Sequence, residues 1–254
     1  MYCIGVIALN TFRENLRDKI SYNLLLFAAA LMSASLLLGS LTVAEQEKIV
    51  ADMGLAAINM IGVIIAIFVG IGLVSKEIDR RTIYTIMARP ISRAQFVVGK
   101  YIGLVVTLTV NVFIMFAVFL FTLWWSRSPI HASLLQAVEL ILVELLVVTA
   151  LALLFSTFSS PMVSASMTLG LYVLGHLTPD LKGIAEKSQN DLTGMLMTLI
   201  YYVCPNLEML NIKGQAAAGV PVSLVYQSMA TVYGLFYASL LLAVACVIFQ
   251  RRDF

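Results

Sequence analysis

The stretch EIDRRTIYTIMARPISRAQFVVGK, residues 77–100, orients the whole chain, because it is the long charged insert between two apolar runs of lipid-spanning length. Acidic side chains are few in it, namely Glu77 and Asp79. Its basic residues are Arg80, Arg81, Arg89, Arg93 and Lys100. Loops next to membrane spans that carry an excess of Lys and Arg stay in the cytoplasm. The stretch is therefore predicted to be a cytoplasmic loop.

The loop pattern predicts a short amphipathic helix. Ile83, Ile86 and Met87 are spaced i, i+3, i+4 and so share one helical face. Pro90 ends this helix, because proline disfavours helical geometry in the residue before it. A loop that only connects two spans needs no apolar face, so we expect another protein to grip this one. The alternative is a solvated basic connector that only fixes topology.

A second helix is predicted to begin at Arg93 and to run into the membrane. Ser92 and Gln95 have the spacing of a capping box just before it. In that motif each of the two side chains bonds the backbone amide of the other residue.

The order and spacing of the loop residues resemble the cytoplasmic loop of ABC-2 type transporter permeases. The positions that align with the family pattern are Glu77, Arg81, Thr82, Met87 to Pro90, Ser92, Arg93, Gly99 and Lys100. The loop departs from the family at Arg81, where glycine is common. The similarity extends to Pro205, Asn206 and Leu207 and to the terminal residues Phe249 to Asp253. It is greatest for the subgroup that includes the permeases of nitrous-oxide reductase maturation and of bacterial gliding.

This resemblance implies a permease homodimer that binds two separate ATP-binding subunits, each gripping one loop and closing on ATP to open an export path. ATP and Mg²⁺ would be bound by those subunits. This chain has no G-x-x-x-x-G-K-[ST] motif, so we expect it to hold no cofactor and to be no enzyme. The residues expected to couple to the ATPase are Arg81, Thr82, Ile83, Ile86, Met87, Arg89 and Pro90.

Composition places the chain in a membrane. It has 254 residues, 61% hydrophobic and 12% charged, with a mean hydropathy of +0.96. That is too little polar surface to cover a soluble globule of this size. The net charge of +2 argues against a nucleic-acid partner. The three cysteines show no metal-ligand spacing and no disulfide framework, and no signal-peptide pattern begins the chain.

Six stretches are long enough to cross about 30 Å of hydrocarbon at about 1.5 Å per residue, which predicts an all-α membrane protein with a single domain, residues 1–254. The fifth is short, but Pro161 suits a first helical position and the topology needs an outward crossing there. The predicted spans are 22–41, 53–75, 98–125, 133–158, 161–177 and 226–249.

Residues 2–19 have an apolar stripe on one helical face, which predicts an amphipathic helix lying in the cytoplasmic membrane interface with this stripe in the acyl boundary. The stripe consists of Ile4, Ile7, Ala8, Thr11, Phe12 and Leu16. An ordinary surface helix is the alternative. Most Lys and Arg residues fall on the predicted inner segments, so both termini are predicted to be cytoplasmic and the protein to lie in the inner (cytoplasmic) membrane. These residues are Arg13, Arg17, Lys19, Lys76, Arg80, Arg81, Arg89, Arg93, Lys100, Arg251 and Arg252.

The outer segment 178–225 is predicted to contain a re-entrant helix. Met195 to Val203 is apolar but too short to cross, and Pro205 stops it. We mark Pro205 and Asn206 as the residues of this outer re-entrant segment, a feature that ABC-2 permeases also have. A helix lying flat on the outer surface is the alternative.

Two carboxylates, Glu139 and Glu144, lie inside the fourth predicted span. Glu144 is about 15 Å from the outer end of that helix, and an ionised carboxylate there costs at least ~2.5 kcal/mol without a partner. We expect Glu144 to be shielded from lipid, with a functional, subunit-contact or hydrogen-bonded packing role. Glu139 lies about 140° around the helix and is expected nearer the headgroups. His131 and His176 form no metal motif and are predicted to be satisfied interfacial histidines.

Two spans carry ridges of small residues, which let helices approach closely. We expect packing within the chain, with contact to a second subunit as the alternative. The ridges are Gly62, Ala66 and Gly70, and Ala230, Gly234 and Ala238.

Three functions fit a polytopic helical protein of this kind, and the permease of an ABC exporter is favoured. A proton-coupled secondary transporter working through Glu144 would show internal repeats and broken central helices, which the sequence lacks. An intramembrane enzyme of the serine protease type would show a nucleophile motif such as G-x-S-x-G, which is also missing.

Overall fold

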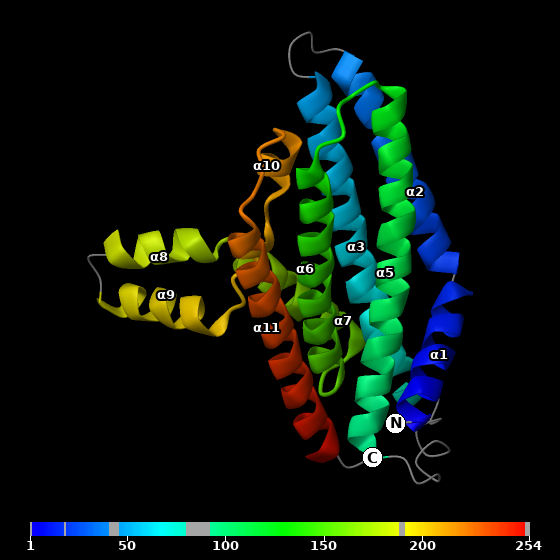
Figure 1. The fold of residues 1–254 in the computed structure, drawn as a ribbon. Helices are drawn as coiled ribbons and strands as arrows, with labels where there is room; N and C mark the ends of the chain where they lie inside the picture. Colours follow the sequence, from blue (N-terminus) through cyan, green and yellow to red (C-terminus); the bar gives the residue numbers. More distant parts are fainter. Residues whose placement is uncertain (1, 18, 41–45, 80–91, 188–190, 252–254) are drawn as a thin grey trace.

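The computed structural model describes residues 2–17, 19–40, 46–79, 92–187 and 191–251 (Figure 1). Within that part of the chain all regular structure is helical, which confirms the predicted all-α class there. The elements in order are α1 (Tyr2–Leu16), α2 (Lys19–Ser40), α3 (Gln46–Asp79), α5 (Arg93–Trp125), α6 (Ala132–Ser156), α7 (Pro161–His176), α8 (Thr178–Lys187), α9 (Asp191–Val203), the 3-10 helix η1 (Leu207–Leu210), α10 (Lys213–Ala217) and α11 (Leu224–Arg251).

Five of the described helices are long and apolar enough to cross a membrane. They are Tyr22–Gly39 of α2, Gln46–Gly72 of α3, and the whole of α5, α6 and α11. They coincide with five of the six predicted spans. The remaining one, 161–177, corresponds to α7, whose 16 residues extend about 24 Å and so fall short of the ~30 Å hydrocarbon core. Its crossing of the membrane stays a prediction.

Helix α6 is the centre of the bundle, with α3, α5, α7 and α11 packed around it (Figure 1). Both ridges of small residues face it. A methyl group on Gly62 of α3 would lie 2.7 Å from Leu145, and one on Gly234 of α11 would clash with Val143. The predicted packing of these ridges within the chain is therefore confirmed.

Two predicted helix starts are also confirmed. Gln95 N–H donates to Ser92 Oγ and Ser92 N–H donates to Gln95 Oε1, both at 3.2 Å, so the capping box is complete and α5 begins at Arg93. Helix α7 begins with Pro161 in its first turn, after Ser160 in extended geometry. In both places a local signal was sufficient to determine where the helix starts.

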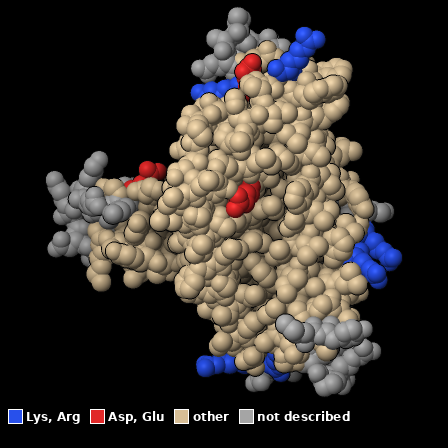
Figure 2. All heavy atoms as spheres, viewed as in Figure 1, with Lys and Arg blue, Asp and Glu red and all other residues tan. Residues whose placement is uncertain are grey.

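The beginning of α1, the beginning of α5 and the end of α11 lie at the same end of the bundle, and α8 and α9 project as a hairpin from its side (Figure 1). Figure 2 shows the same side of the molecule as a broad, mostly uncharged surface, with Lys and Arg atoms mainly at its two ends and on one flank and a small acidic spot near its middle. A wide, mostly apolar belt between charged ends is typical of a membrane-spanning bundle.

Candidate functional sites at the start of α5 and around Glu144

The first turns of α5 are bound to the last turn of α11. Arg93 Nη1 donates to the carbonyl oxygen of Gln250 at 3.1 Å and lies 3.5 Å from that of Phe249. The Phe96 and Phe249 rings are stacked, with centroids 6.0 Å apart and planes inclined by 17°. A cation at the carboxyl end of a helix satisfies its terminal carbonyls and complements its dipole. The helix that leaves the predicted cytoplasmic loop is thus tied to the chain's last long helix.

On another side, α5 is in close contact with α1. Gly99 and Gly103 form the contact surface on α5. A methyl group on Gly103 would lie 2.6 Å from both the carbonyl oxygen of Ala8 and Cβ of Thr11, and one on Gly99 would lie 2.9 Å from the Ile7 side chain. Ile7, Ala8 and Thr11 of the apolar stripe therefore pack on α5 and do not face lipid as predicted. The position of α1 in the membrane interface stays a prediction.

Polar contacts reinforce the junction between α1 and α5. Lys100 is buried, and its Nζ lies 3.9 Å from Glu14 Oε2 and 5.7 Å from the centre of the Phe96 ring. About two helical turns further along α5, Asn15 Nδ2 donates to Thr107 Oγ1 at 3.3 Å. Helices α1, α5 and α11 therefore form one connected unit at this end of the bundle.

The predicted ATPase-coupling residues belong to the loop that leads into this unit. They lie outside the described residues, so their role stays a prediction. They are Arg81, Thr82, Ile83, Ile86, Met87, Arg89 and Pro90.

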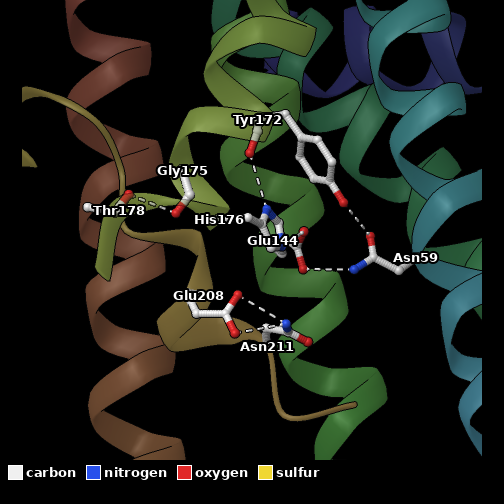
Figure 3. A network of polar contacts seen from close by, with 8 residues as sticks. All are labelled: Asn59, Glu144, Tyr172, Gly175, His176, Thr178, Glu208 and Asn211. Atoms are coloured by element: carbon white, nitrogen blue, oxygen red, sulfur yellow. Dashed lines mark hydrogen bonds and ion pairs between the residues drawn. The ribbon is translucent and has the colours of Figure 1, made fainter. Parts of the chain in front are cut away.

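A second candidate site surrounds Glu144, which is fully buried halfway along α6 (Figure 3). Its Oε2 accepts a hydrogen bond of 3.1 Å from Asn59 Nδ2 on α3. Asn59 Oδ1 in turn accepts from the Tyr172 hydroxyl on α7 at 3.4 Å. Glu144 thus links three helices through side chains, and it is enclosed by protein on all sides.

The other oxygen of Glu144 faces His176, at the end of α7. Glu144 Oε1 and His176 Nε2 lie 3.4 Å apart, within ion-pair distance but without the alignment of a hydrogen bond. Both atoms are buried and have no other hydrogen-bond partner among the described residues. His176 Nδ1 lies 3.1 Å from the Tyr172 carbonyl oxygen. The prediction of a satisfied interfacial histidine at position 176 is therefore wrong.

The segment that follows α9 packs against this site. Gly175 leaves room for it, because a methyl group there would lie 2.8 Å from both the Pro205 carbonyl oxygen and Leu207 Cγ. The Asn206 amide donates to the Tyr233 hydroxyl of α11 at 2.8 Å. Pro205 and Asn206, the predicted re-entrant residues, therefore lie between α7 and α11, and re-entry into the membrane stays a prediction.

Glu139 lies on a different side of α6 and is exposed. Its Oε2 accepts from Gln227 Nε2 and its Oε1 from Thr231 Oγ1 at 3.3 Å, both on α11. Gln136 Nε2 donates to Gln227 Oε1 at 2.8 Å. Glu139 thus belongs to a polar strip along the seam of α6 and α11 and not to the Glu144 site, in line with the separation of about 140° around the helix.

Sequence reasoning identified Glu144 but missed the partners Asn59, Tyr172 and His176. A usable signal was present. Asn59 is a lone amide in an apolar run, and Tyr172 and His176 stand four residues apart, on one face of a short helix. Neither signal says that α3 and α7 meet at Glu144, since Asn59 and Glu144 are 85 residues apart in the chain.

These residues offer no metal centre, because the described part of the chain has no cluster of three or more His, Cys, Asp or Glu side chains that could hold an ion. A comparison with curated proteins found no match. The model of the ABC-2 family of transporter proteins, in contrast, matches residues 7–254. That match covers nearly the whole sequence and includes both candidate sites. The chain therefore belongs to the ABC-2 family and is a multi-pass membrane permease of an ABC transporter.

Proposed function

We propose that this permease is the membrane subunit of an ATP-driven exporter and that a separate ATP-binding subunit drives it through the loop at residues 80–91. The observation that carries the proposal is the construction of α5. This helix starts directly after the loop, its first turn is capped, and it is bound to both α1 and α11. A force applied to the loop would therefore be transmitted to three helices instead of being lost in a loose connection.

The position of both chain ends supports a six-span topology with cytoplasmic termini in the inner membrane. The start of α1 and the end of α11 lie at the same end of the bundle (Figure 1). Termini on one side of a membrane require an even number of crossings, and on this proposal the segment 161–177, which contains α7, makes the sixth. The excess of Lys and Arg on the loop and at the chain ends makes that side cytoplasmic.

The partners we propose are two ATP-binding subunits, which hold ATP and Mg²⁺, and a second copy of this chain. Permeases of this family normally work with an ATP-binding subunit. The export path would lie between the two permeases, and lipid would cover their remaining apolar faces. The loop residues shared with the nitrous-oxide-maturation and gliding permeases favour that subgroup.

The loop proposal is tested by the double variant Ile83→Ser/Met87→Ser. Buried anchors of small interfaces cost more than ~1 kcal/mol each when truncated, so losing two should weaken binding of the ATP-binding subunit by about 25-fold or more. We expect a folded, inserted permease that no longer co-purifies with its ATPase and no longer stimulates ATP hydrolysis.

A matched control is Val220→Ser/Leu224→Ser, which removes two exposed apolar side chains before and at the start of α11, whose other end is the one bound to α5. This control should keep the ATPase bound. Co-purification of the ATPase with the loop variant at wild-type yield and activity would remove the loop from the mechanism.

A proton-coupled secondary transporter is the second candidate, favoured by the burial of Glu144 beside His176. The two functions separate in proteoliposomes. Transport driven by a proton gradient without any ATP-binding subunit would support the second candidate, and transport that requires ATP and that subunit would support the exporter.

A further inference from the structure

We propose that Glu144 and His176 form a buried proton-binding site, in which one proton is held between Glu144 Oε1 and His176 Nε2. This proton-binding site is an addition to the export function proposed above. It follows from the hydrogen-bonding capacity of the groups around it, and it stands whether or not the loop at residues 80–91 binds an ATPase.

The first step fixes the tautomer of His176. Its Nδ1 lies 3.1 Å from the Tyr172 carbonyl oxygen, and a carbonyl can only accept a hydrogen bond. Nδ1 must therefore carry a proton and donate it. In a neutral imidazole the other nitrogen then has no proton and acts as an acceptor. The neutral form of His176 thus turns a lone pair of Nε2 toward Glu144.

The second step concerns the oxygen that faces it. An ionised carboxylate also acts only as an acceptor. With Glu144 ionised and His176 neutral, two acceptors would face each other at 3.4 Å, with no other hydrogen-bond partner for either atom among the described residues. A buried acceptor without a donor is destabilising, and a buried charge without a partner is more so.

One added proton removes this conflict in either of two ways. It makes Glu144 a carboxylic acid that donates to Nε2, or it makes His176 an imidazolium that donates to the carboxylate. Aligning the pair requires only small rotations about the last torsions of the two side chains, which are soft. Both arrangements hold one proton between the same two atoms.

The groups around the pair provide no aligned donor to Oε1 among the described residues, although the Tyr172 hydroxyl lies close to the carboxyl group. Asn59 on α3 donates to Oε2, and the Tyr172 hydroxyl donates to Asn59. Besides His176, the charged groups that act on Glu144 from the described residues are Lys213 of α10 and Glu208 of η1, which have opposite signs. Glu208 is itself held by Asn211, which donates to both its oxygens at 3.1 Å (Figure 3).

The site joins α7 to the rest of the bundle. Few residues of α7 are buried, namely Ser164, Thr168 and Gly175. The pair of His176 and Glu144 adds a polar contact between this helix and α6. The His176 side chain is 21% exposed, so this side of the pair is not closed off by the described residues.

The proton can be located spectroscopically, because the chain has only two histidines. Protein with ¹⁵N-labelled histidine in the His131→Gln background reports His176 alone. At neutral pH we expect one of two results: a neutral imidazole protonated on Nδ1 together with the infrared carbonyl band of a protonated Glu144, or an imidazolium without that band. Neutral His176 beside an ionised Glu144, or protons on both groups at once, would overturn the proposal.

A stability measurement gives a second test. Above the ordinary titration range of histidine the folded protein holds one proton more than the unfolded chain, so its unfolding constant should rise with pH, by up to about tenfold per pH unit. Glu144→Gln, whose amide can donate to Nε2, should abolish this component, while Glu139→Gln should retain it. Equal pH profiles for wild type and Glu144→Gln would contradict the site. The spectroscopic test keeps Glu144 in place and so does not depend on the stability of that variant.

Discussion

Replacing Gly103 with alanine should separate α1 from α5. The added methyl group would lie 2.6 Å from the Ala8 carbonyl oxygen and from Thr11 Cβ, and one of these is backbone that cannot rotate away. Overpacking of this kind costs about 1–3 kcal/mol. Each kcal/mol lowers Tm by about 2–4 °C in a chain of this length, so we expect Gly103→Ala to lower Tm by about 2–12 °C. The change also moves Glu14 away from Lys100, so stimulation of the partner ATPase should fall as well.

The matched control is Gly170→Ala in α7, where a methyl group would have no neighbour within 4 Å. Alanine is favoured over glycine within a helix by about 0.5–1 kcal/mol, so this variant should keep or slightly raise Tm. Thermal unfolding of both variants in the same detergent gives the comparison. If Gly103→Ala is as stable as Gly170→Ala, then α1 does not pack on α5 as described and the proposed transmission through α5 fails.

Three further changes test other parts of the structure. Arg93→Ala removes a charged donor from the last carbonyls of α11. Because the guanidinium is partly exposed, the protein should lose only about 1 kcal/mol of stability, and an unchanged Tm would show that this contact does not stabilise the fold. Asn59→Leu leaves Glu144 Oε2 and the Tyr172 hydroxyl without their hydrogen-bond partner. It should lower the free energy of unfolding by about 1–3 kcal/mol for each buried group. An unchanged free energy in denaturant unfolding would show that these hydrogen bonds do not stabilise the fold. After removal of the native cysteines, an impermeant thiol reagent should label a cysteine at Ser188 from outside but not one at Ser92, and the reverse pattern would invert the topology.

Local signals predicted the start of two helices correctly. The side chains of Ser92 and Gln95 bond each other's amides, and Pro161 suits a first turn, because each effect acts within a few residues of the chain. Helix ends are set by which residues satisfy the first free amides, and this is visible in the sequence. The five long spans were predictable for a similar reason, since length and hydropathy alone decide whether a helix can cross.

The contacts of α1 were not predicted, because an apolar stripe fits lipid and another apolar helix equally well. The sequence did contain a pointer in Gly99-x-x-x-Gly103, a spacing that lets two helices approach closely. The contact of Glu144 with His176 was missed for a different reason. The choice of partner for a buried carboxylate depends on how α6 and α7 are rotated against each other, and neither helix carries that information alone.

The two sites divide the bundle into a part that moves together and a part that can separate from it. Helices α1, α5 and α11 are joined at one end through Arg93, Gly99 and Gly103, so a push on the loop before α5 would displace all three. Helix α7 shares none of these contacts and packs instead on α3 and α6, in part through the Glu144 site. Helix α6 packs along α11 and α5 and would move with them, so the motion would load the contact between α6 and α7, where the proposed proton is held. Occupancy of that site by a proton would then set how readily α7 parts from α6, and ATP hydrolysis by the assembled transporter should depend on pH in the wild type but much less in Glu144→Gln.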